Sequence, residues 1–236
     1  NPIEMGADLG EVVERLKARP EMVAAFAAAF GPGTVIEADL VARALAAFER
    51  TLITPDAPFD RFLAGEADAL TAQQIRGMGL FESVGCIVCH AGPGFSRASL
   101  LAPEQGRAAF RAFPSLASPF TAKYRLTEDL GAATGGTRGL WRVPSLRNVE
   151  LTAPYFHNGS VADLAEAVRV MATVQAGRIV TDGRVETMVE WSPELRVVTR
   201  RTPSPLREAE VADIVAFLKS LTGRVPTVGP AVVAGR

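Results

Sequence analysis

The chain has 236 residues, which is enough for one large domain or two small ones. Its apolar fraction of 48% is ordinary for a globular protein and argues against a disordered chain. With 25 basic and 26 acidic residues the net charge is -1, which argues against a nucleic-acid partner, since such partners need a basic face. No apolar run approaches the ~18 residues of a membrane span. Because the chain opens on Asn1-Pro2 rather than Met, we expect a mature or trimmed product whose targeting segment is gone.

Residues 1–56 are predicted to form a helical segment. Asp8 and Glu11 have the spacing of a capping box, and apolar residues then recur at helical spacing. An alanine-rich helix is expected over 21–30, with Gly31 as its C-terminal cap. The turn-rich sequence ITPDAP that follows a third helix predicts a boundary between two parts of the chain.

The second part, 57–223, is predicted to combine a few helices with long loops. Thr71 and Gln74 are expected to begin a helix that leads to the two cysteines of the chain. Ser160 is expected to cap a later helix, and Gly223 to close the last one.

Between these helices the sequence indicates loops. Residues 91–160 are rich in proline and glycine, and residues 176–206 are again turn-like, with weak strand signals throughout. Long loops in a compact protein need something to fold around, and a large buried cofactor is one such group. The tail, 224–236, is expected to be loose.

Both cysteines and one of the two histidines lie in one short motif, Cys86-Ile87-Val88-Cys89-His90. Cys-x-x-Cys-His is the attachment signature of c-type haem. The spacing lets each thiol form a thioether with one haem vinyl group and places His90 as the proximal ligand of the iron. A zinc site would need four ligands, and His157 is the one other histidine. A redox dithiol would accompany a βαβ pattern, which is missing, and a disulfide at this spacing is uncommon.

We therefore predict a mostly α protein, with one covalent haem c. It would consist of a c-type cytochrome domain with long haem-wrapping loops, 57–223, an N-terminal helical segment, 1–56, and a tail. As in c-type cytochromes, the helix before the motif is expected to cross the last helix, with Gly77 allowing close approach and Phe81 packing beside it.

The sixth iron ligand must come from a methionine, the second histidine, or nothing. The candidates are Met5, Met22, Met78, Met171, Met188 and His157. Met171 lies on the apolar face of its predicted helix, and Met188 is its rival; a methionine on such a face is more often simply core packing. The residues alone leave this choice open.

Five segments of the chain resemble the bacterial di-haem cytochrome c peroxidases. They cover over a third of the sequence: NPIEM (1–5), AFERTLITPDAPFDRFLAGE (47–66), LTAQQIRGMGLFESVGCIVCHAGPGFS (70–96), WRVPSLRNVELTAPYFHNGSVADLAEAVRVM (141–171) and EVADIVAFLKSLTG (210–223). The pairing of VPSLRN with LTAPYFH after a Cys-x-x-Cys-His motif is highly specific to that family.

The resemblance implies two haem domains, of which the Cys86–His90 motif matches the C-terminal, high-potential one. In the family an N-terminal haem cleaves hydrogen peroxide, and the C-terminal haem, with His and Met ligands, receives electrons from a small donor. The axial methionine of the family follows the histidine of PYFH by fourteen residues, as Met171 follows His157. Related enzymes that mature a tryptophylquinone cofactor have Tyr there, so Met171 favours the peroxidase branch.

Further site residues are implied by the resemblance. The carbonyls of Thr152 and Pro154 match a calcium site, and Glu4 matches the acidic residue that assists proton transfer in the peroxide pocket. Arg142 and Arg147 are candidate partners of haem propionates, because guanidinium groups bind carboxylates through two hydrogen bonds. His157 is expected to orient its loop or bond a propionate, without a catalytic role.

The chain departs from the family in having one Cys-x-x-Cys-His motif rather than two. It is then a fragment, or one of two polypeptides, or a single-haem relative. The leading hypothesis is the electron-transfer portion of a periplasmic peroxidase that takes electrons from a small cytochrome c or copper protein, with a second haem in the N-terminal half and a homodimeric intact enzyme. A single-haem electron carrier is the alternative, and a haem-based sensor with a weak sixth ligand is a third.

Overall fold

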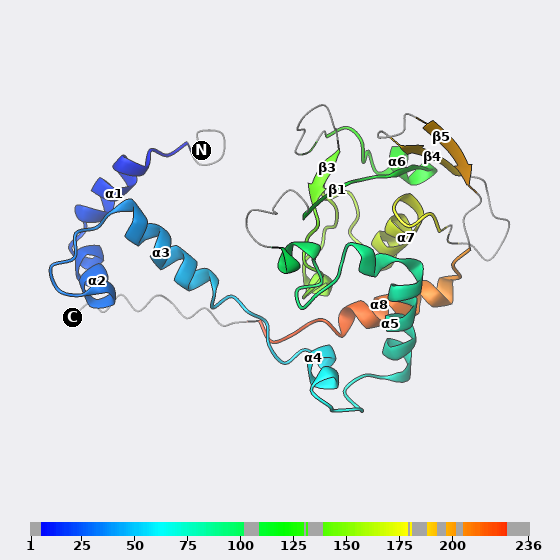
Figure 1. Ribbon diagram of the computed structural model, residues 1–236, viewed down its shortest axis with the longest axis horizontal. Coiled ribbons are helices and arrows are strands. Elements are labelled where there is room, and N and C mark those ends of the chain that lie inside the picture. Colours follow the sequence, from blue (N-terminus) through cyan, green and yellow to red (C-terminus); the bar gives the residue numbers. More distant parts are fainter. Residues whose placement is uncertain are drawn as a thin grey trace. The chain divides into compact units, whose positions relative to one another are not determined.

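The computed structural model describes residues 6–101, 109–129, 131, 139–178, 180, 188–192, 197–201 and 205–225, the backbone alone being described for 188–192 and 197–201. Figure 1 labels the elements that lie in these ranges. The helices are α1 (Leu9–Lys17), α2 (Pro20–Phe30), α3 (Ala38–Glu49), α4 (Pro58–Leu63), α5 (Ala72–Val84), α6 (Pro119–Lys123), α7 (Leu164–Val174) and α8 (Glu208–Lys219). Short 3-10 turns are η1 (Cys86–Val88), η2 (Arg97–Leu100) and η4 (Val149–Leu151). The strands are β1 (Phe110–Ala112), β2 (Leu116–Ala117), β3 (Leu140–Arg142), β4 (Met188–Ser192) and β5 (Val197–Arg201). The prediction of a mostly helical protein is confirmed.

The contacts divide the chain into two compact units, one ending at Ile53 and the other running from Thr54 to Arg224. In the first unit, α1 to α3 surround a small core of Val13, Phe26 and Ile36. The predicted caps are present: the Asp8 carboxylate accepts a hydrogen bond from the backbone N–H of Glu11, and Gly31 ends α2.

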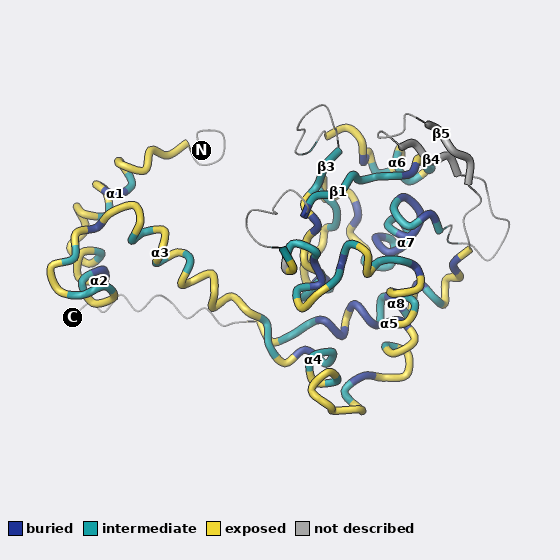
Figure 2. Tube along the Cα trace, in the orientation of Figure 1, coloured by how far each residue is buried: buried dark blue, intermediate teal, exposed yellow. Residues whose placement is uncertain are grey.

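The second unit is built on the crossing of α5 and α8 (Figure 1). Gly77 of α5 lies so close to α8 that a Cβ at this position would be 1.9 Å from the carbonyl oxygen of Asp213. Beside it, the rings of Phe81 and Phe217 pack with their centroids 5.3 Å apart, and both residues are buried. The expected glycine contact and its aromatic neighbour are thus confirmed, and buried residues concentrate along α7 and α8 (Figure 2).

The N-terminus of α5 carries the predicted capping box. The Thr71 hydroxyl accepts a hydrogen bond from the backbone N–H of Gln74, whose side chain accepts one from the backbone N–H of Thr71. Both bonds satisfy groups that a helix leaves open at its first turn.

Two predicted helix ends were wrong. α7 is capped by Asp163, whose carboxylate accepts from the N–H of Glu166, rather than by Ser160. The three residues before Asp163 are kept extended because Val161 forms a bridge with Tyr155. At the other end of the unit, α8 ends at Lys219 with Ser220 as its C-cap, and not at Gly223.

The described residues include two small antiparallel sheets that the weak strand signals of the sequence did not predict. One pairs β1 with β3, and the other has the order β2-β4-β5. β4 and β5 lie in the stretch 176–206 that was predicted to contain only turns. In the described part of the chain, no helix has both the length and the apolar character that a membrane crossing requires.

The Gly77 contact yields a test with an internal control on the same helix. Gly77→Ala should lower the free energy of unfolding by about 1–3 kcal/mol or more, because the new methyl group collides with backbone rather than with a mobile side chain. Gly79→Ala, where nothing lies within 4 Å of the new Cβ, should raise it by about 0.5–1 kcal/mol through helix propensity. Denaturant unfolding of both variants measures the difference. Equal stabilities would show that the two helices do not approach as described.

Candidate functional site

The cysteine motif begins where α5 ends. Gly85 ends α5 in the left-handed conformation, with φ +102°, and turns the chain directly into η1. The backbone N–H groups of Cys89 and His90 both bond the carbonyl of Cys86, at 3.2 and 3.0 Å. This turn gathers the two thiols and the imidazole in one short stretch, with both cysteines free and half-buried.

His90 is buried and fixed by a hydrogen bond. It is 8% exposed, and its Nδ1 lies 3.0 Å from the carbonyl oxygen of Phe95. Burial lowers the pKa of His90, and the carbonyls of Phe95 and Pro144 oppose this shift only in part. The ring is therefore set up as a neutral imidazole whose Nδ1–H donates to Phe95, which leaves Nε2 as the nitrogen for a metal.

The environment of Cys86 argues against a dithiol redox role. Burial raises the pKa of its thiol to about 11, with the nearby Cys89 adding to the shift. A thiol with this pKa stays protonated near neutral pH, whereas a dithiol redox site uses a thiolate as its nucleophile. Within the residues that the structure describes, no group of three or more His, Cys, Asp or Glu side chains is placed to hold a metal ion.

The loop after the motif is packed around Phe95. The Phe95 ring is 7% exposed and packs against the rings of Phe59, Phe81 and Phe217, with centroid distances of 5.1 to 6.1 Å. The backbone of Phe95 has φ +47°, in the left-handed region that non-glycine residues rarely adopt. Such a conformation persists where the surroundings hold it, and here it presents the carbonyl to His90.

Met171 lies on α7 between two hydrophobic clusters. Val170 belongs to a cluster with Leu126 and Val174, whereas Ala172 belongs to the main core with Phe217. Met171 is half-buried and is in neither cluster. Met171 is thus not assigned to either cluster, and its role as an iron ligand stays a prediction. By contrast, Met78 packs against the main core and Met22 against the core of the first unit.

Two buried ring nitrogens, Trp141 Nε1 on β3 and His157 Nε2 in the loop before α7, have no hydrogen-bond partner among the described residues. Their rings stack with centroids 4.0 Å apart and an interplanar angle of 12°. Burial lowers the pKa of His157, and the charge of Asp129 opposes that shift. Buried N–H donors without acceptors are costly unless a bound group completes them, and haem propionates supply such acceptors. The residues present therefore fit a haem.

The remaining predicted residues lie on β3 and in the loops before and after η4. Arg142 is exposed on β3, and Thr152 and Pro154 are exposed in the loop after η4. Arg147 binds Asp60 and the carbonyl of Pro93. Roles of these residues toward propionates or calcium stay predictions.

Three predicted positions cannot be compared with the structure. Glu4 and Met5 lie outside the described residues, and so does the side chain of Met188.

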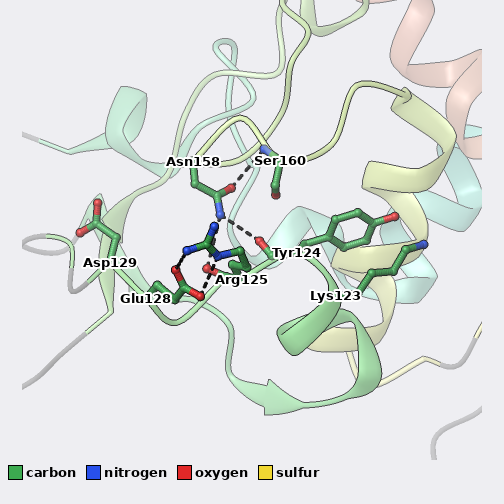
Figure 3. Close-up of a pocket in the computed structure, with 7 residues that line it drawn as sticks. All are labelled: Lys123, Tyr124, Arg125, Glu128, Asp129, Asn158 and Ser160. Carbon is green, nitrogen blue, oxygen red and sulfur yellow. Dashed lines mark hydrogen bonds and ion pairs between the residues drawn. The ribbon is translucent and has the colours of Figure 1, made fainter.

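The structure also contains a polar surface cavity of about 920 Å³ that no sequence pattern predicted (Figure 3). It is lined by Lys123, Tyr124, Arg125, Glu128, Asp129, Asn158 and Ser160. Inside it, the Asn158 side chain donates to the carbonyl of Tyr124, at 2.9 Å, and Arg125 pairs with Glu128 (Figure 3). The first of these bonds joins the loop after His157 to the end of α6, and the second compensates the charges of Arg125 and Glu128.

Comparison with known proteins finds a matching family model and several similar proteins. Residues 1–68 match the model of the family described as di-haem cytochrome c peroxidase. The chain is 34% identical to the cytochrome c551 peroxidase of Nitrosomonas europaea, over 96% of this chain and 57% of that protein. It is 35% identical to the cytochrome c peroxidase Ccp of Escherichia coli, over 94% of this chain and 41% of that protein. It is 33% identical to the methylamine utilization protein MauG of Methylorubrum extorquens, over 93% of this chain and 54% of that protein.

These matches confirm the predicted resemblance: the chain is similar to the di-haem cytochrome c peroxidases and to MauG. The chain spans roughly half the length of these curated relatives, at 57%, 41% and 54%.

Proposed function

We propose that this chain holds one haem c through Cys86, Cys89 and His90 and acts as the electron-transfer portion of a cytochrome c peroxidase. One observation carries the proposal: a buried imidazole with Nδ1 fixed by Phe95 follows directly after two free thiols on one turn. Relatives named cytochrome c peroxidase support the same assignment.

When bound, the haem would supply a one-electron redox centre. The chain would attach it through the two thiols, and His90 Nε2 would ligate its iron. The Phe95 carbonyl fixes the tautomer of His90 and makes the imidazole a stronger donor. The aromatic cluster around Phe95 excludes water from this side of the site.

Met171 is proposed as the sixth ligand. Its exclusion from both core clusters supports this role, and so does its fourteen-residue offset from His157. Thioether ligation raises the potential of a haem and closes the position that peroxide would need. This haem would therefore store and pass electrons rather than cleave the O–O bond.

Peroxide chemistry would then belong to a second haem, on an upstream segment or a partner chain. We assign residues 1–56 to that peroxidatic half, with Glu4 assisting proton transfer there. Calcium between the halves would use the carbonyls of Thr152 and Pro154, since carbonyl oxygens suit calcium. Periplasmic maturation, a small donor cytochrome c or copper protein, and a homodimeric intact enzyme belong to the same proposal.

A second candidate function is favoured by the single Cys-x-x-Cys-His motif of the sequence. A chain with one haem closed by Met171 would serve as an electron carrier without catalysis of its own. The two functions share the haem site and differ in whether a peroxide-cleaving haem works with it.

Covalent attachment is the first test of the proposed function. The chain produced with a haem c maturation system should gain the mass of one haem and keep its colour through acid–acetone extraction, because thioether bonds survive this treatment. Changing both Cys86 and Cys89 to Ala should release the haem into the organic phase, whereas Ser83→Ala, on the exposed last turn of α5, should not. An unmodified mass for the unaltered chain would contradict the assignment.

Replacement of the sixth ligand is the second test. Met171→His should lower the reduction potential by a sizeable part of the ~0.8 V range that axial ligands span, because imidazole stabilises the oxidised iron more than a thioether does. Redox titration followed by absorbance measures the shift. Met78→Leu, in the main core, is the matched control and should leave the potential near its original value. A potential unmoved by Met171→His would transfer the role to Met188.

Activity is the third test. The isolated chain should be redox-active but turn over peroxide far more slowly than ~1 per second, the lower end of ordinary enzyme rates, because its iron has no open position. Steady-state oxidation of a reduced donor by peroxide measures this, with and without the upstream haem segment. Turnover at an ordinary enzymatic rate by the isolated chain would mean that its own haem binds peroxide.

A further inference from the structure

Arg147 makes an unusual set of contacts for a loop arginine. Its Nη1 and Nη2 bind the two carboxylate oxygens of Asp60 on α4, at 2.8 and 2.7 Å, and its Nε donates to the carbonyl of Pro93, at 2.7 Å. Its side chain is 22% exposed, and the guanidinium carbon lies 5.7 Å from the centre of the Phe95 ring. Such two-point ion pairs fix geometry as well as contributing energy.

These contacts are part of a set of hydrogen bonds, called the fastening below, that joins one loop to another. The proximal loop, residues 93–96, runs beside residues 143–147. Three hydrogen bonds join them: Arg147 Nε to Pro93 O, at 2.7 Å, Ser145 Oγ to Gly94 O, at 2.6 Å, and Ser96 Oγ to Val143 O, at 2.7 Å.

Phe95 is the residue of the proximal loop that bonds inward instead. Its carbonyl lies 3.0 Å from His90 Nδ1, and its backbone has the unfavourable φ of +47°. The residues on both sides of it are held by the neighbouring loop, so the position of this carbonyl depends on that fastening. Arg147 anchors the fastening to α4 through Asp60.

We propose that Arg147 is a positioning residue for the axial histidine: by anchoring the proximal loop to Asp60, it holds the Phe95 carbonyl on His90 Nδ1 and thereby sets the reduction potential of the haem. This inference rests on the proposed haem function and deepens it. It gives Arg147 a role that does not require contact with a propionate.

The direction of the effect follows from ligand chemistry. A hydrogen bond from Nδ1–H to a carbonyl makes the imidazole a stronger electron donor, which favours the oxidised iron. Weakening that bond should therefore raise the potential. Removing the positive charge of Arg147 would by itself lower the potential, since a cation near the iron disfavours the oxidised form. A charge-conserving substitution separates the two effects.

The experiment uses the haem-loaded chain with Arg147→Lys, which keeps the charge and loses the two-point pair. The matched control is Arg76→Lys, which breaks the Arg76–Asp213 pair, of 2.9 and 3.1 Å, between α5 and α8. Redox titration gives the potential, and proton NMR gives the solvent exchange of the His90 Nδ1–H. We expect Arg147→Lys to raise the potential and to speed this exchange on the order of tenfold, since a weakened hydrogen bond opens more often. Arg76→Lys should change neither.

Ser145→Ala provides a second, neutral variant that removes one fastening bond and keeps the ion pair. It should move both readouts in the same direction as Arg147→Lys by a smaller amount, and it keeps the test valid if Arg147→Lys fails to fold. The inference is overturned if both variants match Arg76→Lys. It is also overturned if the Nδ1–H exchange is unchanged in both variants, whatever the potential does, because the Phe95 carbonyl would then stay on His90 without the fastening. A chain that accepts no covalent haem overturns the proposed function together with the inference.

Discussion

The hydrogen bond between His90 Nδ1 and the Phe95 carbonyl is the interaction on which the rest of the site depends. It chooses the tautomer of a buried imidazole, and burial in turn keeps that imidazole neutral. Around it, α5 delivers the motif through Gly85, and the aromatic cluster holds Phe95. The position of the motif and the packing of Phe95 both depend on the close crossing of α5 and α8 at Gly77. This crossing brings together Phe81 and Phe217, which pack against Phe95.

This arrangement connects local structure to the proposed electron transfer. Electron transfer requires less structural rearrangement when the ligand is rigid and its surroundings change little between oxidation states. The fastening of the proximal loop by residues 143–147 provides such rigidity without additional elements of regular structure. In the proposed function, the loop segments 93–96 and 143–147 are therefore parts of the site as well as connections between helices.

The features that the sequence predicted well are local ones. The Thr71–Gln74 capping box, the Asp8 cap and the Gly31 cap each depend on residues within a few positions of one another. The helix start at Ser160 failed because Asp163 is an equally good cap, and a bridge between Tyr155 and Val161 decided between them. The strands β4 and β5 were not predicted from the sequence. A strand, unlike a helix, is stabilised by partners that are distant in the sequence, such as β2 for β4. The motif at Cys86 could be predicted from its spacing alone. The Arg147–Asp60 pair could not, because its residues are 87 positions apart and no local sequence pattern indicates the contact.

The central claim is a single haem whose iron is closed by His90 on one side and Met171 on the other. Proton NMR of the reduced, haem-loaded chain tests it most directly, because the methyl group of a ligating methionine lies over the haem ring and gives a strongly shifted three-proton signal. The account predicts one such signal in the unaltered chain and its loss in Met171→Leu. A spectrum without the signal, or a signal that persists in Met171→Leu, would contradict the account.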